Sequence, residues 1–174
     1  MLKNNQIIIK PLEKKHLGSL MNLRNDPEIR FYLTSILPIN EHMQEEWFKT
    51  ISLDDSKMYF AIENRKGEFL GLVRCDEWDK INRSIRIGVD IIPTQQRKGY
   101  STAAYTLLFR YLFHDLGINR VWLLVTEYNK KALALYKKLH FVEEGKQRAA
   151  IFRKGKFHDY MMMSILKKEY DTSF

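Results

Sequence analysis

A short basic loop between two apolar segments is the part of this sequence best suited to bind an anion. It reads Gln96-Arg97-Lys98-Gly99-Tyr100-Ser101. The preceding residues 85–92 are rich in β-branched side chains and end at Pro93, which predicts a strand, whereas residues 104–112 carry apolar side chains at helical spacing. A helix that begins just after a strand presents unpaired N–H groups and the positive end of its dipole, and two basic side chains add full charges. The loop therefore predicts a phosphate site, best matched by a pyrophosphate ligand, although an ordinary helix start has the same pattern.

A second strand-to-helix segment follows at a consistent distance. Residues 120–125 are apolar and predict a buried strand, after which Glu127-Tyr128-Asn129 leads into a short amphipathic helix. Asn129 stands at the N-cap position, where its side chain can accept a hydrogen bond from a first-turn N–H. One face of this helix carries Ala132, Leu135, Tyr136 and Leu139, and His140-Phe141 comes next.

Taken together, the two segments resemble the GNAT superfamily of acetyl-coenzyme A-dependent N-acetyltransferases. The phosphate loop of that family reads (Gln/Arg)-x-x-Gly-x-(Gly/Ala), and its later segment reads Asn-x-x-Ala-x-x-x-Tyr-x-x-x-Gly-Phe. Both are present in this order, with Ser101 in place of the small Gly or Ala and His140 in place of the Gly before Phe141. Serine still lets the backbone approach a phosphate, and histidine tolerates the left-handed conformation expected at that helix end.

The resemblance implies a fold and a co-substrate. We expect a single domain over residues 1–174 with a mixed α/β, three-layer architecture. Its central sheet is mostly antiparallel and splays apart between strands four and five, and helices cover both faces. Acetyl-CoA is the expected co-substrate, with its pantetheine arm in the splay and no metal. The residues predicted to hold it are Val89, Asp90, Ile91, Gln96, Arg97, Lys98, Gly99, Tyr100, Ser101, Thr102, Asn129, Ala132 and Tyr136.

Acetyl transfer from a thioester to an amine requires a deprotonated amine, a stabilised oxyanion and a proton for the departing thiolate. The resemblance implies that Tyr136 donates this proton, although its ring could equally pack in the helix stripe. Many relatives carry a glutamate base in strand four, but here that place is held by Arg86. Asp76 and Glu77 on the preceding strand are the nearest replacements, and we predict Glu77 as the catalytic carboxylate. A water chain is the alternative base.

The acceptor site is expected near residues 23–48. The pattern of this region is similar to the branch of the superfamily that acetylates nucleotide-linked amino sugars, whereas the C-terminal half also resembles enzymes that acetylate ribosomal-protein N-termini and polyamines. The predicted substrate-binding residues are Arg24, Asn25, Arg30, Trp47 and Arg86. Because arginines favour an acceptor with phosphate or carboxylate, the sequence ranks a nucleotide-linked amino sugar first, a peptide N-terminal amine second and a polyamine third. A CoA-binding module without catalysis is the alternative of another class.

Composition narrows the remaining choices. The 174 residues include 29 Lys and Arg against 21 Asp and Glu, a net charge of +8, which suits either an anionic coenzyme or a nucleic acid. The chain carries no nucleic-acid-binding motif, and no apolar run approaches the roughly 18 residues that span a bilayer. The N-terminus lacks a secretion signal, and Cys75 is the single cysteine. We therefore expect a cytoplasmic enzyme without membrane or nucleic-acid partners; a homodimer is left open.

Hydrophobic periodicity and turn residues give the order of elements. Strands are predicted at 6–10, 57–64, 69–77, 83–92, 120–127, 141–153 and 157–166. Helices are predicted at 13–24, 27–33, 41–51, 99–115 and 130–139. Two further segments, residues 64–67 and 153–156, each end a strand with a glycine-containing turn that predicts a hairpin.

Overall fold

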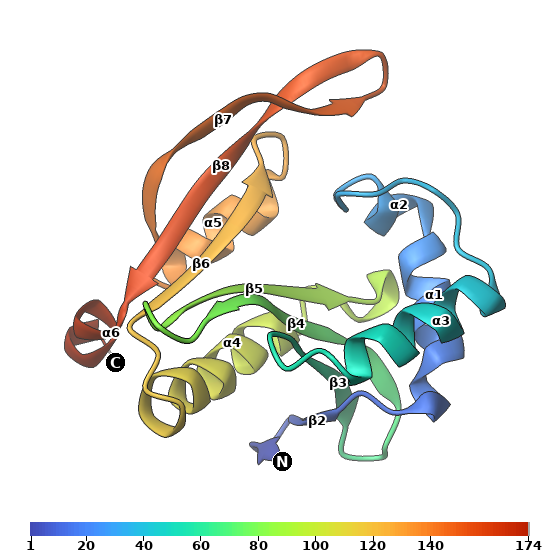
Figure 1. Ribbon diagram of the computed structural model, residues 1–174, viewed down its shortest axis with the longest axis horizontal. Helices are drawn as coiled ribbons and strands as arrows, with labels where there is room; N and C mark the ends of the chain where they lie inside the picture. The colour runs from blue at the N-terminus through green and yellow to red at the C-terminus, as the bar shows by residue number, and fades with distance from the viewer. Residues whose placement is uncertain (174) are drawn as a thin grey trace.

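A computed structural model describes residues 1–173 as one mixed sheet covered by helices on both faces (Figure 1). Within these residues eight strands follow the order β1-β2-β3-β4-β5-β6-β8-β7. The strands are β1 (Leu2–Lys3), β2 (Ile7–Pro11), β3 (Met58–Asn64), β4 (Phe69–Asp79), β5 (Ser84–Ile91), β6 (Arg120–Thr126), β7 (Val142–Arg153) and β8 (Lys156–Leu166). The helices are α1 (Leu17–Asn25), α2 (Pro27–Arg30), α3 (Glu41–Ser52), α4 (Tyr100–Arg110), α5 (Lys130–Lys138) and α6 (Lys167–Ser173).

The sheet splays where the sequence predicts it. Strands β5 and β6 are parallel neighbours, yet they pair only over Ser84–Arg86 and Arg120–Trp122. Beyond Arg86 the two strands have no pairing with each other, and every other neighbouring pair in the sheet is antiparallel. The predicted mostly antiparallel three-layer fold, open between these strands, is confirmed.

Two apolar layers hold the helices to the sheet. Successive strand residues point to opposite faces, so Ala61 packs with Leu72, α1 and α3, whereas Ile62 packs in the larger cluster around α4. This division places α1 to α3 on one face and α4 on the other (Figure 1). The loops that leave the splayed strands therefore meet helices from both layers.

Helix α4 is buried over a wider arc than the helical spacing of apolar residues in 104–112 predicts. Tyr105 and Phe109 of α4 are buried in addition to the predicted face, as is Phe113 in the π-helical turn Tyr111–Asp115 that follows. Tyr105 contacts Tyr136 and Phe141, whereas Tyr170 of α6 contacts Phe109 and stacks on Phe113 at a centroid distance of 4.9 Å. Helix α6, strand β1 and the 3₁₀ turn Pro93–Gln95 were not predicted, and α2 ends at Arg30 rather than at residue 33. The helix predicted at residues 13–24 begins with a 3₁₀ turn, Lys14–His16, before α1.

Strands β7 and β8 form a long hairpin that projects beyond the body of the protein (Figure 1). Its turn is Lys154-Gly155, with φ of 48° and 76°. Two central residues with positive φ make the tight turn whose twist matches that of the flanking strands. The hairpin turn predicted at residues 153–156 is therefore present, and it places Lys154 at the tip.

Candidate active site at the splayed strands

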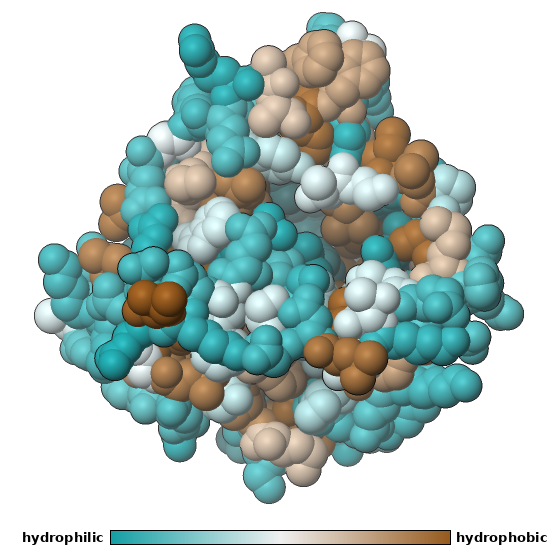
Figure 2. Space-filling model, viewed as in Figure 1, coloured by the Kyte–Doolittle hydropathy of each residue, from teal (hydrophilic) through white to brown (hydrophobic). Residues whose placement is uncertain are grey.

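A cavity of about 840 Å³ opens where β5 and β6 separate. Figure 2 shows a hollow in this part of the molecule, with hydrophilic and hydrophobic side chains around it. The lining residues come from α2 and the segment after it, β5, the loop before α4, the start of α4, α5 and the hairpin tip. They are Pro27, Glu28, Ile29, Phe31, Tyr32, Val89, Asp90, Ile91, Gln95, Gln96, Arg97, Gly99, Tyr100, Ser101, Thr102, Tyr105, Asn129, Lys131, Ala132, Leu135, Tyr136 and Lys154.

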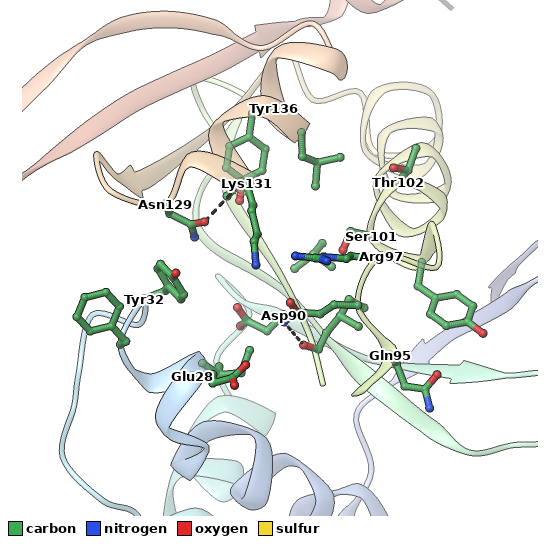
Figure 3. Close-up of a pocket in the computed structure, with 18 of the residues that line it drawn as sticks. Glu28, Tyr32, Asp90, Gln95, Arg97, Ser101, Thr102, Asn129, Lys131 and Tyr136 are labelled. Carbon is green, nitrogen blue, oxygen red and sulfur yellow. Dashed lines mark hydrogen bonds between the residues drawn. The ribbon is translucent and has the colours of Figure 1, made fainter. Parts of the chain in front are cut away.

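The basic loop forms one end of the cavity. Gly99 has a φ of 84° and Arg97 a φ of 63°, so the chain turns sharply before α4 begins at Tyr100. The first N–H groups of α4 thus face a concave site together with the positive end of the helix dipole. Arg97 and Lys131 point toward each other across this end (Figure 3). Two converging cations beside a helix N-terminus fit a pyrophosphate.

One predicted member of the loop points elsewhere. Lys98 does not line the cavity, and its ammonium donates to the side-chain oxygen of Gln95 at 2.7 Å. Gln96 has a structural task as well, because its side-chain amide donates to the carbonyl of Ile91 at 3.2 Å and so fixes the loop to the end of β5.

Strand β5 supplies the floor of the cavity. A Cβ placed on Gly71 of β4 would lie 2.1 Å from the carbonyl oxygen of Asp90, so this carbonyl is directed at β4 and not into the splay. Asp90 instead contributes its side chain, which pairs with Arg74 at 3.2 Å. Arg74 lies across Gly88, where a Cβ would meet its guanidinium at 2.6 Å. Gly88 of β5 therefore leaves room for the Asp90–Arg74 ion pair at the cavity floor.

Tyr136 of α5 lines the cavity, where its ring lies beside Lys131 and Asn129 (Figure 3). Its ring packs edge-on against Tyr105 and Phe141, at centroid distances of 5.8 Å and 5.6 Å, and its hydroxyl accepts a hydrogen bond from that of Tyr105 at 3.4 Å. Burial raises the pKa of Tyr136 above its ordinary value. The phenol is therefore protonated near neutral pH and is chemically able to donate a proton into the cavity.

The start and end of α5 follow the predicted local chemistry. Asn129 caps the helix, accepting a hydrogen bond from the N–H of Ala132 at 3.2 Å. At the other end His140 adopts the left-handed conformation with a φ of 61°. The chain thus accommodates histidine where the related pattern has glycine, and α5 keeps the orientation that directs Tyr136 inward.

The opposite end of the cavity is formed by Glu28, Phe31 and Tyr32, to which Lys154 adds a side chain from the hairpin. Phe31, Tyr32 and Tyr128 form an aromatic cluster with centroid distances between 4.8 Å and 5.8 Å. Sequence reasoning placed the acceptor site in this region but did not single these residues out. The signal available was the aromatic pair after a proline-initiated helical turn, which by itself also fits a core.

The residues predicted to bind the acceptor lie outside the cavity lining. Arg24 donates to Gln44 at 3.2 Å and covers the ring of Trp47 at 4.8 Å. Asn25 holds the main chain of Ile39 with two hydrogen bonds of 2.7 and 2.8 Å. Arg30, at the end of α2, is also absent from the lining. The side chains of Arg24 and Asn25 fasten α1, α3 and the segment between α2 and α3 to one another.

The predicted catalytic carboxylate is also remote from the cavity lining. Glu77, at a bulge in β4 with a φ of 50°, pairs with Arg86 at 2.8 Å, and Asp76 pairs with the same arginine at 2.6 Å. Arg86 further covers the ring of Trp122 at 5.8 Å. Two carboxylates thus compensate the arginine that stands in the usual glutamate position, and none of the three groups lines the cavity.

Two further findings concern metal ions and membranes. Within residues 1–173 no cluster of three or more His, Cys, Asp or Glu side chains is arranged to hold a metal ion. None of the helices in the same part of the chain has the length and apolarity needed to cross a bilayer.

Comparisons with known proteins agree with this geometry. The family model described as an acetyltransferase (GNAT) domain matches residues 6–142. The chain is 29% identical to spermidine N(1)-acetyltransferase of Vibrio cholerae, over 96% of each sequence. It is 29% identical to the Escherichia coli enzyme of the same name, over 93% of this chain and 87% of the relative. A crystal structure of the Vibrio cholerae enzyme with CoA and spermine has a TM-score of 0.90 and 30% identity, covering 96% of this chain and 99% of that one.

Proposed function

Because the chain belongs to the GNAT family and is an acetyl-CoA-dependent N-acetyltransferase, we propose that its acceptor is a cationic alkylamine of the polyamine class. Similarity to spermidine N(1)-acetyltransferases over nearly the whole chain supports this acceptor. The observation that carries the proposal is the composition of the acceptor end. The carboxylate of Glu28 lines it and has no ion-pair partner among residues 1–173, and the aromatic rings of Phe31 and Tyr32 lie beside it. Carboxylates and aromatic faces both attract alkylammonium groups.

The charge argument for an anionic acceptor loses its basis in the structure. It rested on the net charge and on Arg24, Arg30 and Arg86, none of which lines the cavity. Arg86 is compensated by Asp76 and Glu77, and the positive residues that do line the far end, Arg97 and Lys131, suit the phosphates of the coenzyme. The polyamine alternative is therefore favoured over the nucleotide-linked amino sugar ranked first from sequence.

The residues that line the cavity suggest how acetyl-CoA and the acceptor would lie in it. Phosphates would bind between Arg97, Lys131 and the start of α4, and the pantetheine arm would extend along the open side of β5. The thioester would then lie near Tyr136. As the amine nitrogen forms its bond to the acetyl carbon and the carbon–sulfur bond breaks, Tyr136 gives its proton to the departing thiolate, and the proton that the nitrogen loses on becoming an amide restores the phenol.

The acceptor must arrive as a neutral amine, because an alkylammonium with a pKa of about 10.4 has no lone pair for attack. Glu77 cannot take this proton from a group inside the cavity, since it is held by Arg86 outside the lining. The cavity is open to solvent, so we propose that water removes the proton, the alternative that the sequence also allowed.

A panel of acceptors tests the proposal. Release of the CoA thiol is followed with spermidine, an Ala-initiated peptide and a nucleotide-linked amino sugar, each with saturating acetyl-CoA. Spermidine should give the highest kcat/KM. In Glu28→Gln its KM should rise about fivefold, the worth of a partly exposed ion pair of about 1 kcal/mol, with the KM for acetyl-CoA unchanged. Glu45→Gln, an exposed position on α3, is the matched control.

Other outcomes have clear meanings. Preference for the peptide or the amino sugar would contradict the polyamine acceptor while leaving the acetyltransferase in place. Binding of acetyl-CoA without turnover of any amine would favour the non-catalytic CoA-binding module.

A further inference from the structure

The tip of the β7–β8 hairpin is fastened to the segment that follows α2. Arg153, which is 7% exposed, donates to the carbonyl of Phe31 at 3.3 Å, to that of Thr34 at 3.1 Å, and also to that of Leu33. Tyr128 donates to the same Phe31 carbonyl at 3.0 Å. A guanidinium presents its donors in a rigid fork, so several carbonyls together fix its position. The hairpin tip and the acceptor end of the cavity therefore form one unit.

This attachment determines where the next residue lies. Lys154 is the first residue of the tight turn, with a φ of 48°, and directly follows the anchored Arg153. Its ammonium lies 4.9 Å from the ring centroid of Phe31, the geometry of a cation–π contact, and its side chain lines the cavity. An alkylammonium on a four-carbon stem thus already occupies one aromatic face of the acceptor end.

The charges at this end add up simply. Four charged groups contribute: Glu28 carries −1, Lys154 carries +1, and the Asp90–Arg74 pair adds −1 and +1, which gives zero. No carboxylate within residues 1–173 forms an ion pair with Lys154. Removing the charge of Lys154 would therefore change the acceptor end from neutral to −1.

We infer that Lys154 is a specificity-determining residue whose ammonium occupies the aromatic site that a distal ammonium of the acceptor would otherwise use. The inference rests on the proposed polyamine function and states which members of that class the site disfavours. Each additional positive charge on the acceptor meets the fixed charge of Lys154 at the acceptor end of the cavity, where like charges repel. Acceptors with three or four charges are therefore penalised relative to those with one or two.

The experiment compares four amines of increasing charge: butylamine, putrescine, spermidine and spermine. Lys154→Gln removes the charge and keeps most of the side chain, Lys154→Arg keeps the charge, and Lys156→Gln removes an exposed charge at the same tip that does not line the cavity. In Lys154→Gln the kcat/KM should rise about tenfold for spermine and about threefold for spermidine, and stay unchanged for butylamine. The gain should shrink as salt increases, because screening weakens the repulsion. Lys154→Arg and Lys156→Gln should keep the order of preference of the unaltered protein.

Two results would overturn the inference: an equal change for butylamine and spermine, or the same gain in Lys156→Gln as in Lys154→Gln. Calorimetric titration of spermine into the CoA complex gives a test that is independent of turnover. Equal affinity, or no binding, in the unaltered protein and Lys154→Gln also overturns it. Tighter binding to Lys154→Gln without acetylation of any amine would instead contradict the proposed function alone.

Discussion

Replacing Tyr136 by phenylalanine separates catalysis from packing at the centre of the cavity. The ring contacts Tyr105 and Phe141 edge-on, and phenylalanine can keep both contacts. The change removes only the hydroxyl, and with it the 3.4 Å hydrogen bond from Tyr105. A neutral hydrogen bond contributes about 1 kcal/mol to stability, and this one is long, so the variant should remain folded.

The effect on rate should be much larger than the effect on stability. Burial raises the pKa of Tyr136, so the hydroxyl is protonated throughout the neutral range and can act as an acid. General acid catalysis is typically worth about 10²–10⁴ in rate, which at about 1.36 kcal/mol per factor of ten is about 2.7–5.4 kcal/mol of barrier. We expect kcat to fall by this factor, with the KM for acetyl-CoA changed less than about twofold, because the phosphate end of the cavity is untouched.

The assay follows the CoA thiol with a disulfide reagent. Cys75 is the sole cysteine and is fully buried, so the folded protein itself contributes no background. Tyr105→Phe is the matched control, because it removes the same hydrogen bond from the other side and leaves the proposed acid in place. Full turnover in Tyr136→Phe would refute the acid role, and an equal loss in both variants would show that the hydroxyl pair acts through positioning.

Three other predictions follow from the same geometry. Gly99→Asp should raise the KM for acetyl-CoA at least tenfold, because a carboxylate would face the phosphates. Gly99→Ala is the control: it shares the strain of a φ of 84°, but its Cβ would meet no atom within 4 Å. In the same titration Gly99→Ala should raise the KM far less. Burial raises the pKa of Cys75, so iodoacetamide at pH 8 should leave the folded protein unmodified by mass spectrometry and alkylate it once in urea; labelling of the folded state would contradict the burial. Burial raises the pKa of Tyr105 well above its usual value, so the folded state holds this proton to higher pH than the unfolded chain. The free energy of unfolding that this proton contributes is fully present below about pH 10 and is lost as the pH rises further. Between about pH 9 and 11 the Tm should therefore fall more steeply in the unaltered protein than in Tyr105→Phe. Parallel curves of Tm against pH would exclude Tyr105 as a cause.

The parts of the site predicted from sequence are those specified by local chemistry. Gly99 turns the loop because it adopts a positive φ, and Asn129 begins α5 because its side chain satisfies a first-turn N–H. His140 takes the left-handed conformation expected one residue past a helix. Each of these depends on a few neighbouring residues, so the sequence alone predicts the local conformation of the chain at these three positions.

The acceptor end depends on contacts between segments far apart in the chain. Lys154 was predicted only as part of a turn. Its position on Phe31 requires the whole β7–β8 hairpin and the anchor at Arg153, which lies 119 to 122 residues away in sequence from the carbonyls it binds. Tyr105 lies on the flank of α4 that meets Tyr136 rather than on its apolar stripe. Contacts of this kind between distant segments leave no periodic pattern or motif in the sequence from which they could be predicted.

The largest error of the sequence argument was to treat a net charge as a local one. The excess of +8 is a property of the whole surface, whereas binding depends on the few charges that line the cavity. There, Arg97 and Lys131 lie at the end suited to phosphates, and Glu28 and Lys154 balance each other at the acceptor end. The cavity is thus divided into a strongly positive half and a nearly neutral one. Replacing Lys154 at the exposed hairpin tip by a neutral residue would make the second half negative without altering the first, so acceptor choice can change independently of cofactor binding.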